Sequence, residues 1–250
     1  MKITILLPCL NSIKYLEDAV RSALAQDYDN YDIHAYDNGS TDGSLQYLRQ
    51  IASENDNFIL HEVPNIYKNS FREAVDHCFQ EVDTDYITFL CADDYIDKSY
   101  LSNCMKIVAH DPDKIKCIQS PITGVLDGVK QPSTKHYYKS ISEFKHMCMQ
   151  RSPVSSPSVV YSKDLYPLMN WSPHGGPAHR EAELQEAGAG DYDTFCNFAD
   201  NGIFIYPVTK FLGYYYRWHT EQCTWKVIEE KKKINYDEVI QRYWKNKWQL

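Results

Sequence analysis

Two acidic motifs stand directly after predicted strands and carry the residue types that bind nucleotides and cations. Residues 37–43 (DNGSTDG) follow the run 31–36, and residues 91–94 (CADD) follow the apolar run 86–90. In an open α/β sheet, ligands bind beyond the carboxyl ends of strands, near the point where the strand order switches. Carboxylates at two such ends could hold a nucleobase or ribose at one and a divalent cation at the other. That combination suits a nucleotide diphosphate and indicates a nucleotide-sugar enzyme.

The elements that must position these motifs alternate regularly along the first half of the chain. We predict strands at 2–7, 31–36, 58–63 and 86–90, and helices at 13–25, 44–54 and 70–82. In the first helix the apolar residues recur at helical spacing, and Asn11 or Ser12 is expected to cap it. Strands separated by helices of about 10–15 residues imply parallel pairing in βαβ units. Residues 1–97 therefore read as a Rossmann-like nucleotide-binding half.

The pattern changes after residue 97. We predict a helix at 99–109, strands near 117–122 and 123–129, and a helix at 140–150. Residues 152–158 and 172–177 are rich in Ser, Pro and Gly and are expected to be loops. Residues 98–224 would form a smaller acceptor-binding half, and residues 225–250 an amphipathic, locally basic helical tail.

Composition excludes several classes of protein. The chain has 250 residues and a formal net charge of −8, which argues against a general nucleic-acid binder. No stretch approaches the roughly 18 apolar residues of a membrane span, and residues 1–7 read as a buried strand rather than a signal peptide. The eight cysteines form no CxxC pair, which favours free thiols in a reducing compartment. We therefore expect a cytoplasmic location, including the inner face of a membrane.

An ordered set of motifs resembles the family-2 inverting glycosyltransferases. The motifs, in chain order, are residues 5–11 (ILLPCLN), 22–28 (SALAQDY), 37–43 (DNGSTDG), 89–94 (FLCADD), 190–193 (GDYD) and 215–219 (YYRWH). Each motif alone is weakly specific, but their common order covers residues 2–224. The resemblance implies the GT-A fold, an α/β architecture in which one continuous, mostly parallel sheet with helices on both faces joins the two halves.

The resemblance also implies roles for particular residues. The implied nucleotide-binding residues are Pro8, Asn11, Asp37, Asn65, Arg72 and Asp93. Asp37 would accept a hydrogen bond from the base, and Asp93 and Asp94 would hold Mn²⁺ or Mg²⁺. Asp191 would be the general base, and His219 would contact the diphosphate or the metal. The donor would be a nucleotide-diphosphate sugar, with a UDP-sugar favoured, and the acceptor a glycan or a lipid-linked saccharide.

This chemistry requires these residue types. Direct displacement at the anomeric carbon inverts its configuration and needs a base beside the acceptor hydroxyl, a role that suits a carboxylate such as Asp191. A cation bound to carboxylates lowers the cost of the charge that develops on the diphosphate. The chain departs from the family pattern at Asn38, which replaces an Asp, at Leu10, which replaces an aromatic, and at Cys91, which replaces the first Asp of the metal motif.

Each acidic residue also has a purely structural interpretation. Asp37 could cap the following helix, and the pair Asp93–Asp94 could form a turn. Asp191 is expected in a loop, where an acid is more often a solvated charge, and Asp193 and Glu183 compete with it for the role of the base.

Alternatives also remain for His219, for the tail and for the function. His219 could be an ordinary strand-end histidine. The tail could pack on the domain or make peripheral contact with an anionic membrane surface. The main alternative function is a non-catalytic nucleotide-sugar or glycan binder on a degenerate GT-A fold. A nucleotidyltransferase and a dinucleotide oxidoreductase are disfavoured because no Gly-rich loop follows the first strand.

Overall fold

The computed structural model describes residues 1–63, 71–172, 175–183, 189–222 and 235–250, with only the backbone of 71–74. Within them, a seven-stranded sheet has the order β10-β6-β9-β4-β1-β2-β3. Its strands are β1 (Ile3–Cys9), β2 (Tyr31–Asp37), β3 (Phe58–Glu62), β4 (Tyr86–Phe89), β6 (Cys117–Gln119), β9 (Val160–Ser162) and β10 (Ile205–Pro207). Strands β1 to β4 run parallel to one another, whereas β9 runs antiparallel to its neighbours β4 and β6. Because β1 leads to β2 on one side and β4 lies on the other, the strand order switches between β1 and β4.

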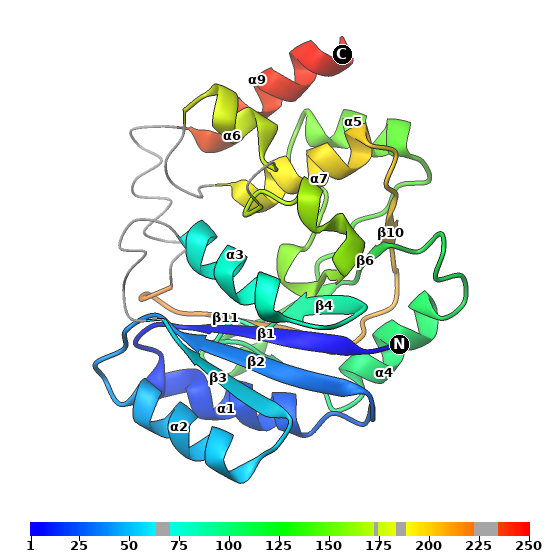
Figure 1. Ribbon diagram of the computed structural model, residues 1–250. Coiled ribbons are helices and arrows are strands. Elements are labelled where there is room, and N and C mark those ends of the chain that lie inside the picture. Colours follow the sequence, from blue (N-terminus) through cyan, green and yellow to red (C-terminus); the bar gives the residue numbers. More distant parts are fainter. Residues whose placement is uncertain (64–70, 173–174, 184–188, 223–234) are drawn as a thin grey trace.

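Helices cover both faces of this sheet (Figure 1). They are α1 (Ile13–Leu24), α2 (Ser44–Glu54), α3 (Phe71–Glu81) and α4 (Tyr100–Val108). Successive residues of β1 point to opposite faces. Ile5 packs in the cluster that contains Leu16 of α1, and Leu6 packs in the cluster that contains Phe79 of α3. Strand β1 is therefore buried on both sides, as its continuous apolar run predicts.

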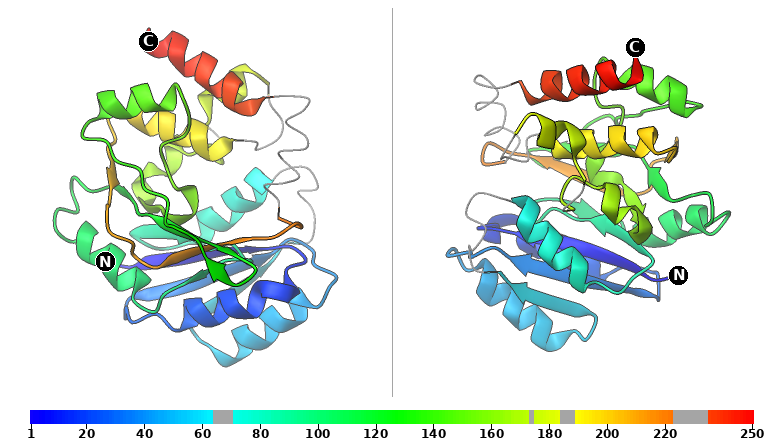
Figure 2. Two further views of the ribbon diagram at one scale, coloured as in Figure 1. Left: turned by 180° about the vertical axis from the view of Figure 1, so that it is seen from behind. Right: turned by 45° about the horizontal axis from the view of Figure 1, so that its top comes forward.

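A second sheet has the order β5-β11-β7-β8 and brings a late part of the chain to the acidic motif after β4. Its strands are β5 (Tyr95–Ile96), β11 (Tyr214–Trp218), β7 (Ile122–Leu126) and β8 (Val129–Lys130). Strands β11 and β7 run parallel, and Figure 2 shows them side by side when the molecule is seen from behind. Strand β5 directly follows residues 91–94 and pairs with β11, so this sheet fixes β11 beside that motif.

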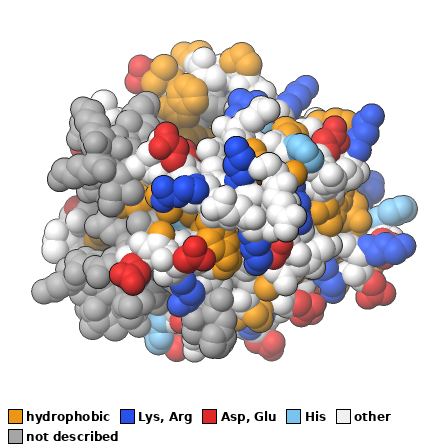
Figure 3. Space-filling model, turned by 90° about the horizontal axis from the view of Figure 1, so that it is seen from above, with side chains coloured by type: hydrophobic (Ala, Val, Ile, Leu, Met, Phe, Trp, Pro, Cys, Tyr) orange, Lys and Arg blue, Asp and Glu red, His pale blue; other side chains and the backbone are white. Residues whose placement is uncertain are grey.

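The remaining helices form a layer above the sheet (Figure 1). They are α5 (Ile141–Cys148), α6 (Pro177–Glu181), α7 (Gly190–Asp200) and α9 (Tyr236–Trp248), with 3₁₀ turns at Ser156–Ser158 and Lys163–Leu168. Tyr236, Ile240 and Trp244 of α9 are buried, so the apolar face of this helix packs on the domain. Figure 3 looks down on this end of the molecule, where basic and acidic side chains are interspersed. Among the helices in the described residues, none is long and apolar enough to cross a membrane.

The strands and helices predicted for residues 1–97 form within two residues of their expected bounds. Three expectations need correction. The second, four-stranded sheet was not expected beside the continuous one. The strand predicted over 123–129 is a hairpin of β7 and β8, because Asp127 and Gly128 both adopt positive φ and turn the chain. The stretch around Asp191, expected to be a loop, is the first turn of α7.

Two further expectations concern the tail and the thiols. Part of the tail, residues 225–234, lies outside the described residues, and its helix is seen from Tyr236 onward. The seven cysteines in the described residues form no disulfide, and all of them except Cys91 are buried.

Candidate functional site

Asp37, the last residue of β2, uses one carboxylate oxygen to build its own loop. Its Oδ2 accepts hydrogen bonds from the backbone N–H groups of Gly39 (2.9 Å) and Ser40 (2.8 Å). Gly39 has φ +84°, a conformation that glycine adopts without strain. The other oxygen, Oδ1, is buried and has no hydrogen-bond partner in the described part of the chain. Because buried acceptors normally have partners, this oxygen is a candidate for binding a ligand.

Asn11 ties the loop after β1 to the loop after β2. Its Oδ1 accepts a hydrogen bond from the N–H of Thr41 (2.8 Å), and its own N–H donates to Ser40 Oγ (2.9 Å). Pro8 lies opposite Tyr36 in the register of β1 and β2. Asn11 and Pro8 thus lie beside Asp37 at adjacent strand ends.

The start of α1 is capped by the neighbouring loop. The N–H of Ile13 donates to Asp42 Oδ2 (3.0 Å), whereas the Ser12 side chain makes no capping bond to α1. Ser12 thus occupies the N-cap position, as expected, but the side chain that caps the helix is that of Asp42, from the loop after β2.

A second group lies at the end of β4. One ligand atom from each of Cys91, Asp93 and Asp94 lies within 4.8 Å of the other two. Asp94 is fully buried and accepts hydrogen bonds from Tyr214 Oη (3.0 Å) and from the N–H of Arg217 (2.8 Å). Burial, followed by the nearby charge of Asp93, raises the pKa of Asp94 well above its usual range. Asp94 therefore fixes β11 against the end of β4.

Asp93 is the accessible carboxylate of this group. Its side chain is 24% exposed, and His219 Nε2 lies 2.9 Å from its Oδ2. The other ring nitrogen, His219 Nδ1, is buried and has no partner among the residues described. The ring of His219 packs against Tyr15 of α1, with centroids 4.6 Å apart. Because Asp42 caps the same helix, α1 links the two groups of candidate residues.

The donor set around Asp93 fits a divalent cation. Carboxylate oxygens are the preferred ligands of Mg²⁺ and Mn²⁺, and imidazole is a common additional ligand. Asp93 offers accessible oxygens, ligand atoms of Cys91 and Asp94 lie within 4.8 Å of one of them, and His219 Nε2 lies 2.9 Å from Asp93 Oδ2. Asp94 lies behind them, and both of its oxygens already accept hydrogen bonds from the protein.

Asp191 is the partly exposed acid at the start of α7. Burial is the main cause that raises the pKa of Tyr161, and the charges of Cys117 and Asp191 add to this rise. Tyr161 in turn packs edge-to-face on Phe89, at the end of β4.

The competing acids have other surroundings. Asp193 is fully buried and bonded to His179 and Trp244, and Glu183 is exposed after α6. Two predicted nucleotide-binding residues cannot be placed, because Asn65 and the side chain of Arg72 lie outside the described residues.

Some buried polar atoms near these groups were not anticipated from the sequence. Tyr36 Oη, Asn38 Oδ1 and Trp171 Nε1 have no hydrogen-bond partner among the described residues. Trp171 packs edge-to-face on Phe89 and Tyr161, so it lies over the end of β4. The one available signal was its position just before the Pro- and Gly-rich stretch at 172–177.

Comparisons with known proteins place this geometry in a family. The model of glycosyl transferase family 2 matches residues 4–162. A glycosyltransferase, GlyA, of Streptococcus pneumoniae is 32% identical over 114 residues, which are 45% of this chain and 16% of that protein. An uncharacterised glycosyltransferase of Haemophilus influenzae is 31% identical over 94 residues, or 38% of this chain and 37% of that protein. The matched segments thus cover well under half of these relatives.

Solved structures share the fold at low sequence identity. Staphylococcus aureus TarS in complex with UDP-GlcNAc superposes with a TM-score of 0.67 at 17% identity, over 89% of this chain and 60% of that one. The mannosyltransferase PcManGT of Pyrobaculum calidifontis, in complex with GDP-Man and Mn²⁺, superposes with a TM-score of 0.56 at 15% identity, over 84% of this chain and 55% of that one. The mostly parallel central sheet and the family match agree with the motif order read from the sequence. The chain belongs to glycosyl transferase family 2 and has the GT-A type of α/β fold.

Proposed function

We propose that this chain transfers a single sugar from a nucleotide-diphosphate donor to a glycan or lipid-linked saccharide, with inversion at the anomeric carbon. The observation that carries the proposal is the placement of two acids on either side of β1. Asp37 ends β2 with one buried oxygen that has no partner among the described residues, and Asp93 follows β4 with an accessible carboxylate. A nucleotide bound across the end of β1 would meet both groups.

A uracil base suits the Oδ1 atom of Asp37. A carboxylate only accepts hydrogen bonds, and the N3–H of uracil is a donor. Cytosine presents an acceptor at the same ring position, so it would face the carboxylate without a hydrogen bond. This match favours a UDP-sugar over a cytidine nucleotide sugar as the donor, with Asn11 and Pro8 shaping the pocket from the end of β1.

The acidic group after β4 would serve the diphosphate. Asp93, with His219 beside it and Asp94 behind it, would hold Mn²⁺ or Mg²⁺. When bound, such a cation offsets the negative charge of the departing diphosphate.

Asp191 would act as the general base. The acceptor hydroxyl oxygen forms the new bond to the anomeric carbon while the bond to the diphosphate oxygen breaks, and the hydroxyl proton passes to Asp191. The partial exposure of Asp191 at the start of α7 supports this role, since its rival Asp193 is buried and fully hydrogen-bonded.

The test is nucleotide release from UDP-, GDP- and dTDP-sugars in the presence of Mn²⁺, comparing the wild type with Asp191→Asn. We expect slow hydrolysis of one donor class by the wild type. In the variant we expect a loss of about 10²- to 10⁴-fold, with donor binding retained. Binding of a nucleotide sugar without any turnover, even with a panel of saccharide acceptors, would favour the alternative of a non-catalytic binder.

A further inference from the structure

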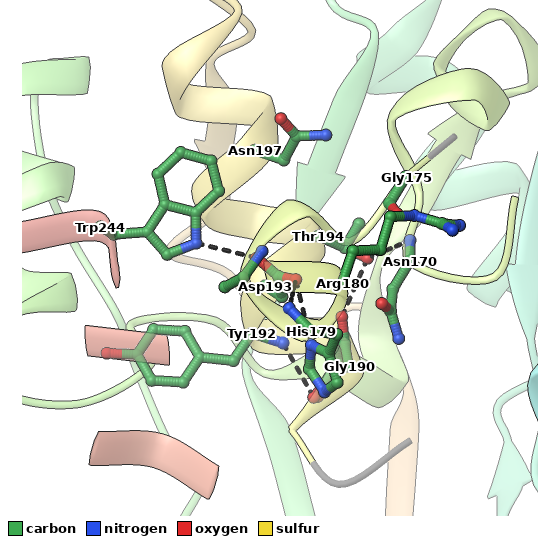
Figure 4. A network of polar contacts seen from close by, with 12 residues as sticks. Asn170, Gly175, His179, Arg180, Gly190, Tyr192, Asp193, Thr194, Asn197 and Trp244 are labelled. Carbon is green, nitrogen blue, oxygen red and sulfur yellow. Dashed lines mark hydrogen bonds and ion pairs between the residues drawn. The ribbon is translucent and has the colours of Figure 1, made fainter. Parts of the chain in front are cut away.

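The buried carboxylate of Asp193 joins three helices. It accepts hydrogen bonds from the N–H groups of Ala178 (3.4 Å) and His179 (3.1 Å) in α6. The Nδ1 atom of His179 lies 3.0 Å from the same carboxylate, and Trp244 Nε1 of α9 donates to it over 2.8 Å. Figure 4 shows Trp244 and His179 converging on Asp193. Because Asp193 has no exposed surface, these groups replace its hydration completely.

The first turn of α7 is held at two more points. The Thr194 hydroxyl accepts a hydrogen bond from the N–H of Asn170 (2.8 Å) and donates to the carbonyl of Gly190 (3.0 Å). A Cβ atom on Gly190 would lie 2.3 Å from Asn170 Nδ2, so this residue must be small. The start of α7 is thus packed closely against Asn170.

Asp191 and Asp193 lie on opposite sides of this turn. Each residue advances about 100° around an α-helix, so side chains two residues apart point in directions about 200° apart. Asp193 points into the junction with α6 and α9, and Asp191 is therefore directed away from that junction. In a rigid helix, the anchoring of one carboxylate sets the position of the other.

We propose that Asp193, clamped by Trp244 of the C-terminal helix, is a positioning residue that holds Asp191 at the acceptor hydroxyl. The proposal rests on the proposed function of Asp191. Helix α9 lies beyond the segment that the family model matches. The proposal gives this helix a part in catalysis, through its effect on the position of the base Asp191. Small displacements of a catalytic group lower the rate strongly, so the clamp affects the chemical step more than donor binding.

The chain supplies a matched control on the same helix. Trp248, one turn after Trp244, donates from its Nε1 to Asp200 Oδ1 (2.9 Å), at the opposite end of α7. Trp244→Phe and Trp248→Phe each remove one indole donor to a carboxylate of α7. Only Trp244 acts next to Asp191.

The experiment measures kcat, the KM for the donor sugar and the thermal midpoint for both variants. We expect Trp244→Phe to lower kcat by about 10-fold or more, with the donor KM changed less than about 2-fold. For Trp248→Phe we expect kcat within about 2-fold of the wild type. Equal effects of both variants on kcat, in proportion to their thermal midpoints, would show a merely structural role and overturn the proposal.

Asp193→Asn provides a second variant of the same size, in case Trp244→Phe does not fold. Its amide group places an N–H₂ against donors of α6 or α9, so we expect the same selective loss of kcat. An unchanged kcat in a folded Asp193→Asn protein would overturn the proposal. Failure of the proposed function is separate from these outcomes, since the wild type itself would then release no nucleotide.

Discussion

Replacing Asp37 by Asn should change which nucleotide the protein binds while leaving its loop intact. The two N–H groups of Gly39 and Ser40 require an acceptor at the Oδ2 position. An asparagine can meet that requirement only with its carbonyl oxygen, which turns its N–H₂ group to the position of Oδ1. The variant therefore presents a donor where the wild type presents a buried acceptor that has no partner in the described segments.

The magnitude follows from the hydrogen bond that is lost. A hydrogen bond to a charged group contributes about 1.5–3 kcal/mol, and 1.4 kcal/mol corresponds to a tenfold change in Kd. We expect the affinity of Asp37→Asn for UDP to fall by about 10- to 150-fold. The affinity for CDP should fall less or rise, because the new N–H₂ can donate to N3 of cytosine.

Isothermal titration calorimetry with UDP and CDP, in the presence of Mn²⁺, measures both affinities. A thermal denaturation scan in the absence of nucleotide serves as the control, and its midpoint should change little. Unchanged UDP affinity in a folded variant would refute the reasoning. It would reduce Asp37 to a residue that only shapes the turn after β2.

Three further predictions concern buried or crowded acids. Asp94→Asn should fold, because its amide can accept from the N–H of Arg217 and donate to Tyr214. Asp94→Ala leaves both groups unpaired and should lower the free energy of unfolding by about 2–4 kcal/mol in urea titrations. Cys91→Asp adds a hard ligand to the acidic group, so calorimetry should show tighter Mn²⁺ binding, and unchanged affinity would contradict this placement of the cation. The third prediction concerns Asp32. Burial acts to raise the pKa of this carboxyl group, but hydrogen bonds from three neighbouring side chains outweigh burial and lower the pKa to about 2. Ionised Asp32 therefore stabilises the folded protein by about 2 kcal/mol. This contribution is complete above about pH 4 and is lost as the pH falls through 2. The free energy of unfolding of Asp32→Asn should therefore be lower than that of the wild type at pH 7 but not at pH 2. An equal difference in free energy of unfolding at both pH values would contradict this prediction.

The first half of the fold could be predicted because its signals are local. Helix α2 forms with the predicted bounds, since apolar spacing and flanking turn residues act within a few residues of each other. Strand β1 could be recognised because a strand buried on both faces is a continuous apolar run.

The second half depends on contacts between distant residues, which leave little trace in local sequence. Strand β9 has three residues and is defined by its pairing with β4 and β6. Helix α7 shows little alternation of apolar and polar residues, because it is buried on most sides by α5, α6 and α9. Its start was therefore mistaken for a loop.

The positions of the candidate residues at strand ends could be predicted from the sequence, but the surroundings of each side chain could not. Sequence spacing does not distinguish Asp93 from Asp94. In the structure Asp94 is buried against Tyr214, and Asp93 remains accessible beside His219. Likewise, the fixing of Asp193 by Trp244 spans 51 residues of sequence and becomes visible only in the packed structure.

The central claim is that Asp37 and Asp93 form one metal-dependent site for a nucleotide diphosphate. Calorimetric titration of UDP, GDP, dTDP and CMP tests it most directly, with and without Mn²⁺, on the wild type and on Asp93→Asn. We predict that the wild type binds UDP in a manner that depends on Mn²⁺, and that Asp93→Asn loses this dependence. The absence of binding for every nucleotide, or equal metal-dependent binding by wild type and variant, would contradict the account.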